Sequence, residues 1–262
     1  ALPSPTVNPN VDDGNVNFPA QDIIESKATQ TSVKLDHHFN NSVTLSGLYL
    51  YQKTSEPDAN YYPDAKYAAP SYQLDRQVHV MVLNNTYILN PSTVATLRFG
   101  LNTFDDNYSL PFDFDMRQVP GINPAFANSL PVQKSPSLAL TDYAGTGFSG
   151  QSDTRYSSWG VNGAVTRLAG SHSLKIGGDY RIIGANALSY GQSAGDYTFN
   201  GRFTGANANN PGNTGNAIAD LMLGYPFDGS LSLTSRFDNY LNYYGGFVQD
   251  DWRVSDKLTV NY

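Results

Sequence analysis

The sequence predicts an all-β protein, a section of an antiparallel transmembrane β-barrel of about eight strands, and three observations carry this prediction. Long segments alternate apolar and polar residues, which is typical of strands with one wet face. Short turns and long loops separate these segments in alternation, as in bacterial barrels with short periplasmic turns and long extracellular loops. Only 15% of the 262 residues are charged and 13% are aromatic, with 18 Tyr, whereas ordinary globular domains carry roughly 25% charged residues.

The alternating segments give the predicted strands and their faces. We expect strands near residues 28–39, 43–54, 72–89, 93–106, 151–168, 173–200, 229–254 and 258–262. The fourth strand has two unlike faces, with Leu97, Phe99 and Leu101 on one and Arg98, Gly100 and Asn102 on the other. Because a barrel meets lipid outside and water inside, the first face is predicted to contact lipid and the second to line the lumen.

Turn-forming residues separate the strands. Short turns are expected near residues 40–41, 90–92, 169–172 and 255–257, where Asn, Ser, Gly and Asp favour turns. Long extracellular loops are expected near residues 55–71, 107–150 and 201–228. One short loop helix is predicted over Ala217–Leu223, capped by Thr214 or Asn216 and ended by Gly224. The two longest predicted strands, residues 173–200 and 229–254, far exceed a span of ~9–11 residues, so we expect them to project beyond the membrane or to break near residues 189–195.

Two parts are indicated along the chain. Residues 1–27 contain four Pro and little alternation, and they are predicted to be a loop or linker, whereas residues 28–262 form the barrel section. No run of about 18 apolar residues predicts a transmembrane helix. The chain begins at Ala1 without Met or a signal peptide and stops at Tyr262 inside a strand, so both ends look cut. The alternative is a mature or designed chain.

Several classes of function lack support. The net charge of −7 argues against a nucleic-acid partner, which requires a basic face. There is no Cys, and neither a nucleophile elbow nor a phosphate-binding loop lies between a predicted strand and a predicted helix, so we predict no catalytic site, no cofactor and no enzyme. His37 and His38 adjoin a turn but point to opposite faces of a strand, which argues against a shared metal ion.

Four carboxylates are candidate ligands. Asp105, Asp106, Asp113 and Asp115 cluster in one predicted long loop, where their oxygens could bind Ca²⁺. Their spacing is not that of an EF-hand loop. The favoured interpretation is therefore a solvated acidic loop.

Aromatic residues provide a second group of candidates. Tyr61 and Tyr62 lie in a long loop, where they could stack on a sugar or siderophore or belong to the aromatic girdle of the barrel. Trp252 is predicted to be a girdle residue at the periplasmic rim. The lumen-facing side of residues 243–247 stays open, because Tyr243 and Tyr244 make both faces aromatic.

Four segments resemble a known family in sequence and in order. They are residues 34–39 (KLDHHF), 172–181 (HSLKIGGDYR), 215–226 (GNAIADLMLGYP) and 244–254 (YGGFVQDDWRV), the last followed by KLTVNY. Together they resemble the barrel of TonB-dependent receptors, in particular the Oar-like group that often carries a carboxypeptidase regulatory-like domain. The resemblance covers most of residues 28–262.

The resemblance implies energy-coupled uptake across the outer membrane of a Gram-negative bacterium. Such receptors have 22 strands around a plug domain, and TonB supplies the energy. Lipid, the protein's own plug domain, TonB and an unidentified solute (a carbohydrate, peptide or siderophore) would be the partners of the full-length protein. Two alternatives stay open: a passive porin-like or structural outer-membrane barrel, and a soluble β-sandwich module that binds carbohydrate.

Overall fold

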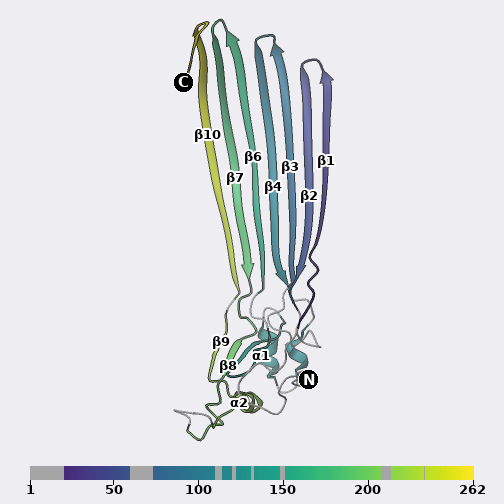
Figure 1. Ribbon diagram of the computed structural model, residues 1–262, viewed down its shortest axis with the longest axis vertical. Coiled ribbons are helices and arrows are strands. Elements are labelled where there is room, and N and C mark those ends of the chain that lie inside the picture. The colour runs from purple at the N-terminus through teal and green to yellow at the C-terminus, as the bar shows by residue number, and fades with distance from the viewer. Residues whose placement is uncertain are drawn as a thin grey trace.

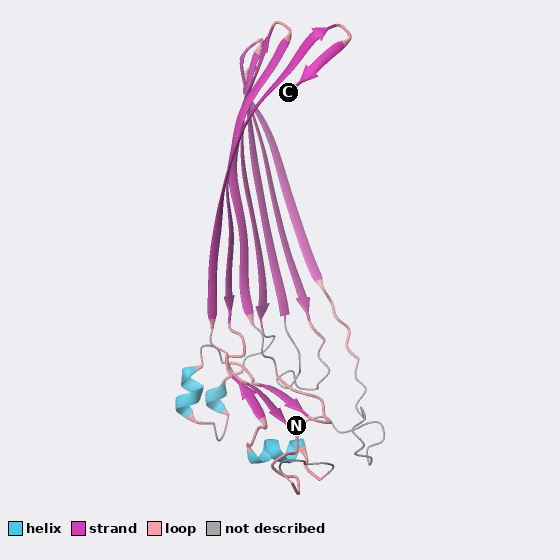
Figure 2. Cartoon of the chain, turned by 90° about the vertical axis from the view of Figure 1, so that its left-hand side faces the viewer, coloured by secondary structure: helices cyan, strands magenta, loops and turns pink. Residues whose placement is uncertain are grey.

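The fold consists of a sheet of eight strands, most of them long, with a smaller folded unit at one end of the sheet (Figures 1 and 2). The computed structural model describes residues 21–59, 73–109, 114–119, 122–130, 133–147, 151–207, 214–232 and 234–262. All short turns lie at one end of the sheet, and the long connections lie at the other. Within the described residues, no helix is long and apolar enough to cross a membrane.

The eight strands of the large sheet match the eight that the alternation predicts. They are β1 (Lys27–Asn40), β2 (Val43–Pro57), β3 (Gln73–Asn90), β4 (Thr93–Ser109), β6 (Ser152–Ala169), β7 (His172–Ser189), β10 (Ser235–Ser255) and β11 (Leu258–Asn261). Their spatial order is β1-β2-β3-β4-β6-β7-β10-β11, and all neighbours are antiparallel. The sheet is open, because β1 and β11 lie at its two edges.

The short turns form as the sequence predicts. The side chain of Asn40 accepts a hydrogen bond from the backbone N–H of Ser42 at 2.8 Å, and Asn90 accepts one from Ser92 at 3.0 Å. These are Asx-type turns, in which a side chain replaces a backbone acceptor. The expected break also occurs, since β7 ends at Ser189 and the chain then turns before the next strand.

The segments after β4 and β7 fold together into the smaller unit, which we call the cap. It contains η2 (Met116–Gln118), α1 (Pro124–Ser129), α2 (Ala217–Leu223) and a sheet of β5 (Ser137–Leu140), β8 (Asp196–Phe199) and β9 (Asp228–Ser230). Strands β5 and β8 pair in parallel, and β8 and β9 pair antiparallel. The prediction of one loop helix was therefore incomplete, although α2 has the predicted bounds. Residues 229–230, expected at the start of one long strand, belong to β9 instead, and residues 196–199, expected at the end of another, form β8.

Local chemistry sets the ends of α2. The side chain of Asn216 accepts a hydrogen bond from the backbone N–H of Ala219 at 3.0 Å, which satisfies a free donor at the first turn. Gly224 ends the helix in a left-handed conformation with φ +73°, which costs Gly little. Of the two predicted caps, Asn216 is the one that the structure uses.

Two apolar clusters hold the cap together. Met116, Ala127, Leu130 and Ala194 form one, and Leu140, Phe199 and Ala217 form the other. Each cluster joins residues from the segment after β4 with residues from the segment after β7, so neither segment packs alone. Lys134, which is fully buried, adds a polar link, because its Nζ donates a hydrogen bond to the carbonyl of Gly191 at 2.7 Å. Burial lowers the pKa of Lys134 to about 8.

Candidate functional site

The pairing of the strands separates two faces of the large sheet. Phe99 pairs with Leu83 and Val161, whereas Arg98 pairs with Asn84 and Asn162. Because directly paired residues share a face, the register extends each face of β4 across the whole sheet. The predicted separation of Leu97, Phe99 and Leu101 from Arg98, Gly100 and Asn102 is confirmed.

The face that carries Phe99 has an apolar band of membrane height. Near the cap, the band ends at one row of paired residues: Lys53, Gln77, Asp105, Arg155, Asn186 and Asp238. Near the turns, it ends at the row in which Thr93 pairs with Arg167. The rows between them, residues 95–103 of β4, carry no Lys, Arg, Asp or Glu on this face. Nine tilted residues match the ~9–11 that a barrel strand needs to cross hydrocarbon.

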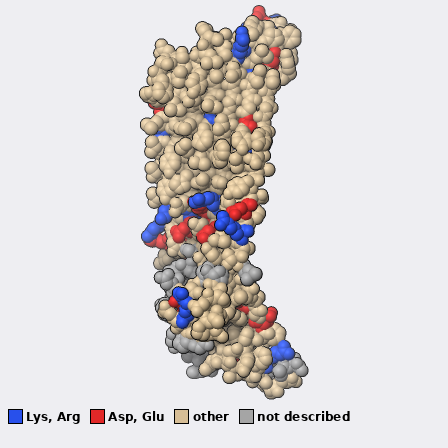
Figure 3. Space-filling model, turned by 180° about the vertical axis from the view of Figure 1, so that it is seen from behind, with Lys and Arg blue, Asp and Glu red and all other residues tan. Residues whose placement is uncertain are grey.

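A belt of charge marks the cap side of this band. Figure 3 shows few charges over the upper sheet and many where the sheet meets the cap. Arg155 forms a two-pronged ion pair with Asp105, with 3.0 Å from Nη2 to Oδ2. Arg236 contacts Asp238 at 2.8 Å, and Asn186 donates a hydrogen bond to the same carboxylate at 2.6 Å. These charged groups lie outside the apolar band, where water can solvate them.

Aromatic side chains line both borders of the band. On the cap side, His79 lies against the rings of Tyr49 and Tyr51, and its Nδ1 is 2.8 Å from the hydroxyl of Tyr49. On the turn side, the ring of Trp252 stacks on His172 with centroids 5.5 Å apart. Aromatic girdles of this kind flank the apolar band of outer-membrane barrels. Trp252 lies at the end of the sheet where it is expected.

The opposite face carries charged groups at the height of the apolar band. Lys34 and Asp36 contact each other at 3.0 Å, Arg181 and Asp179 at 2.7 Å, and Arg98 donates a hydrogen bond to Asn84. Asp36, Arg98 and Asp179 belong to one row of the sheet. Ionised groups at membrane depth face a polar interior or water, because hydrocarbon does not solvate them. This face is therefore the luminal one.

The structure also assigns the faces of residues 243–247. Tyr243 and Phe247 lie on the luminal face, where Arg181 and Lys175 each lie 5.6 Å from the centre of one of these rings. Tyr244 lies on the apolar face against Tyr180, with ring centroids 4.9 Å apart. The segment is thus aromatic on both sides for different reasons: cation contacts inside and ring packing outside.

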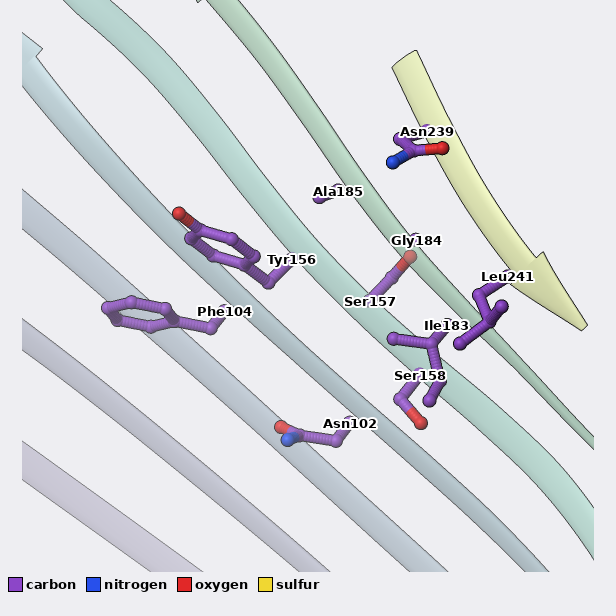
Figure 4. Close-up of a pocket in the computed structure, with 10 residues that line it drawn as sticks. All are labelled: Asn102, Phe104, Tyr156, Ser157, Ser158, Ile183, Gly184, Ala185, Asn239 and Leu241. Carbon is purple, nitrogen blue, oxygen red and sulfur yellow. The ribbon is translucent and has the colours of Figure 1, made fainter. Parts of the chain in front are cut away.

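A hollow of about 360 Å³ lies on the luminal face between the charged rows and the cap. Phe104 and Tyr156 form one side of it, and their stacked rings are 6.1 Å apart with 15° between their planes. Figure 4 shows Asn239 and Leu241 across from these rings, with small residues between them. Its lining consists of Asn102, Phe104, Tyr156, Ser157, Ser158, Ile183, Gly184, Ala185, Asn239 and Leu241. None of these residues is charged.

The carboxylates that the sequence places in one loop are separated. Asp105 and Asp106 lie in β4, so their side chains point to opposite faces; Asp105 pairs with Arg155 outside. Asp106 contacts Arg76 at 3.0 Å on the luminal face, and Arg76 also contacts Glu56 at 2.7 Å. The placement of Asp105 and Asp106 in a loop was wrong, because the strand continues past the membrane border.

The remaining acidic candidates do not complete a cation site. Asp115 caps η2, and its hydrogen bonds with Arg117 lower the pKa of Asp115 to about 2. Asp113 lies outside the described residues, as do Tyr61 and Tyr62. In the part of the chain that the structure describes, no three His, Asp or Glu residues are grouped to hold a metal ion.

Sequence reasoning missed the luminal hollow for a physical reason. Alternation places Phe104 and Tyr156 on strands, but β4 and β6 are joined by the long segment that enters the cap. Short turns fix the register of a hairpin, and long connections leave it open. The alternation around Tyr156 could indicate that this residue lies on a strand. Only the structure shows that this strand, β6, pairs with β4 and brings Tyr156 beside Phe104.

An antiparallel sheet with an apolar band of membrane height outside and charges inside defines the wall of a transmembrane β-barrel. The chain belongs to the outer membrane beta barrel domain family, whose model matches residues 1–262. It is thus a barrel section of the bacterial outer membrane, and the soluble-sandwich alternative does not fit.

A solved structure has a similar fold. It is the outer membrane transporter YddB from Escherichia coli, with a TM-score of 0.53 and 10% sequence identity. The match covers 86% of this chain and 25% of that transporter, so this chain spans about a quarter of its length. At this identity the likeness concerns the fold alone. A comparison with curated proteins finds no match.

Proposed function

We propose that residues 28–262 are a section of the barrel of a TonB-dependent receptor, with residues 1–27 as a linker. The full-length protein would take up a solute with energy supplied through TonB. The observation that carries this proposal is the open sheet with a charged luminal face at membrane depth. The Oar-like sequence segments favour the receptor among the barrels that share such a wall.

The open edges support a larger barrel. An unpaired strand edge in hydrocarbon leaves N–H and C=O groups without partners, at a cost of several kcal/mol for each group. β1 and β11 lie at the edges of this sheet and need further strands beside them in the membrane. A barrel large enough to hold a plug satisfies this need. The likeness to part of a larger outer-membrane transporter agrees with it.

The cap supports a role in capturing solute. It lies at the end of the sheet where long connections gather, which is the extracellular end in outer-membrane barrels. Two connections share its apolar clusters, so it presents one folded surface rather than separate loops. A solute held beneath the cap would meet the luminal face next.

A passive porin-like barrel is the second candidate, because it would share the polar luminal wall. The conductance of the full-length protein in a planar lipid bilayer separates the two. A plugged receptor is expected to show no steady ion current, whereas a porin conducts steadily without an energy source. A steady open current at the outset would refute the receptor proposal.

The gene upstream of residue 1 provides an independent test. A plug domain and a TonB box encoded there are expected for a receptor. A signal peptide that leads directly into Ala1 would contradict the proposal, since it would leave no room for a plug. This result does not depend on knowing the solute.

A further inference from the structure

We infer that the luminal hollow beside Phe104 and Tyr156 is a subsite for a neutral, hydroxyl-rich ligand, an oligosaccharide. The inference rests on the proposed function, because it names the class of solute that passes this wall. It depends on three features of the hollow: its aromatic side, its amides and its lack of charge.

The aromatic side offers a flat apolar surface. Phe104 and Tyr156 pair directly across β4 and β6, and their nearly parallel rings stand beside one another rather than burying each other. Tyr156 leaves 50% of its surface exposed on this face. Both rings offer an apolar surface, and Tyr156 adds a hydroxyl at its edge. A sugar ring, with C–H groups on one face and hydroxyls at its rim, is complementary to such a surface.

The polar groups of the hollow suit hydroxyls. Asn102 and Asn239 each provide an amide donor and acceptor, and Ser158 provides a hydroxyl. Small residues between the two sides, Gly184 and Ala185, leave the space that a ring needs. A few polar groups placed in an apolar hollow are the usual composition of a small-ligand site.

The distribution of charge argues against an ionic ligand. No residue that lines the hollow is charged. On the cap side of the hollow, Arg76 already contacts both Glu56 and Asp106. On the turn side, Arg181 contacts Asp179. An anionic siderophore or a charged peptide terminus in the hollow would lose water without gaining an opposite charge.

The test uses the full-length protein in lipid nanodiscs. Binding of maltopentaose, xylopentaose and chitopentaose is measured by isothermal titration calorimetry, with pentagalacturonic acid and a ferric siderophore as charged comparators. At least one neutral pentasaccharide is expected to bind saturably. Phe104→Ala and Tyr156→Ala are expected to weaken it roughly three- to tenfold each, the loss of one ring contact. Tyr156→Phe keeps the ring and should change affinity by less than about threefold on the same scale.

Phe247→Ala is the matched control, because Phe247 is a luminal aromatic residue on β10 that does not line the hollow. It should leave the affinity unchanged. The inference is overturned if no neutral pentasaccharide binds, or if binding survives both alanine variants. Preference for a charged comparator at the same site would also overturn it. Saccharide binding in a barrel that conducts steadily would refute the receptor proposal while leaving this subsite intact.

Discussion

Phe99→Arg tests the assignment of the two faces most directly. Phe99 lies on the apolar face, six residues along β4 from Asp105 and six from Thr93, the two borders of the band. At about 3.3 Å per residue, each border is about 20 Å away along the strand, or about 14 Å along the membrane normal at ~45° tilt. Phe99 is therefore at the midplane. There, Arg on the lipid face costs about 2–4 kcal/mol, falling to about 0–1 near the interfaces.

Two further variants give the expected gradient. Thr103→Arg places the same charge on the same face, beside the row of Asp105, and should cost about 0–1 kcal/mol. Asn102→Arg places it on the luminal face, where Arg98 and Arg181 already lie near that height, and should cost less than Phe99→Arg. Phe99→Gln is the neutral control, which separates the charge from the loss of the ring.

Unfolding free energies from urea titrations of the full-length protein in lipid vesicles measure these costs. The expected order of cost is Phe99→Arg, then Phe99→Gln, then Thr103→Arg and Asn102→Arg. Equal free energies for Phe99→Arg and Asn102→Arg would refute the assignment. A larger cost at Thr103 than at Phe99 would instead mean that the band is centred elsewhere.

Three predictions concern the cap, and hydrogen exchange of cap amides can follow all of them. The pKa of Lys134 is lowered to about 8 from its ordinary value of 10.5, so between these pH values the unfolded state binds more protons than the folded state. The stability of the cap should therefore rise with pH over this range. Lys134→Met should remove this rise, and a rise that persists in the variant would assign it to another group. Gly201→Ala should destabilise the cap by at least ~1 kcal/mol, because Gly201 has φ +81° and a Cβ there meets the backbone of Gly215 at 2.7 Å; unchanged exchange would contradict this. Asn216→Ala should cost about 1 kcal/mol through loss of the cap of α2, and it also removes the Nδ2 group that donates a hydrogen bond to the hydroxyl of Tyr143. Asn216→Asp keeps the capping oxygen and should cost less; a cost equal to that of Asn216→Ala would argue against capping.

The strands and their faces could be predicted from sequence because they rest on local physics. Alternation with period two fixes which residues share a face, and Asx turns at Asn40 and Asn90 fix the hairpins on either side. Capping residues likewise fix the ends of α2. In each case, the residues that decide the structure lie within a few positions of one another.

The partners across long connections were decided by the tertiary structure alone. The sequence places Asp105 among acidic neighbours, and only the pairing of β4 with β6 brings it to Arg155. The same pairing brings Phe104 beside Tyr156 and so creates the luminal hollow. A long connection leaves the register free, so distant packing must set it.

The cap shows the same division between local and distant information. Its parallel pairing of β5 with β8 and its buried Lys134 join two segments that the sequence presents as separate polar loops. By itself, the sequence determined a wall of about eight alternating strands with one lipid face and one wet face, because that pattern is periodic and local. Only the tertiary structure decided what the two loops build at its end, because apolar clusters shared between segments leave no periodic signal in either.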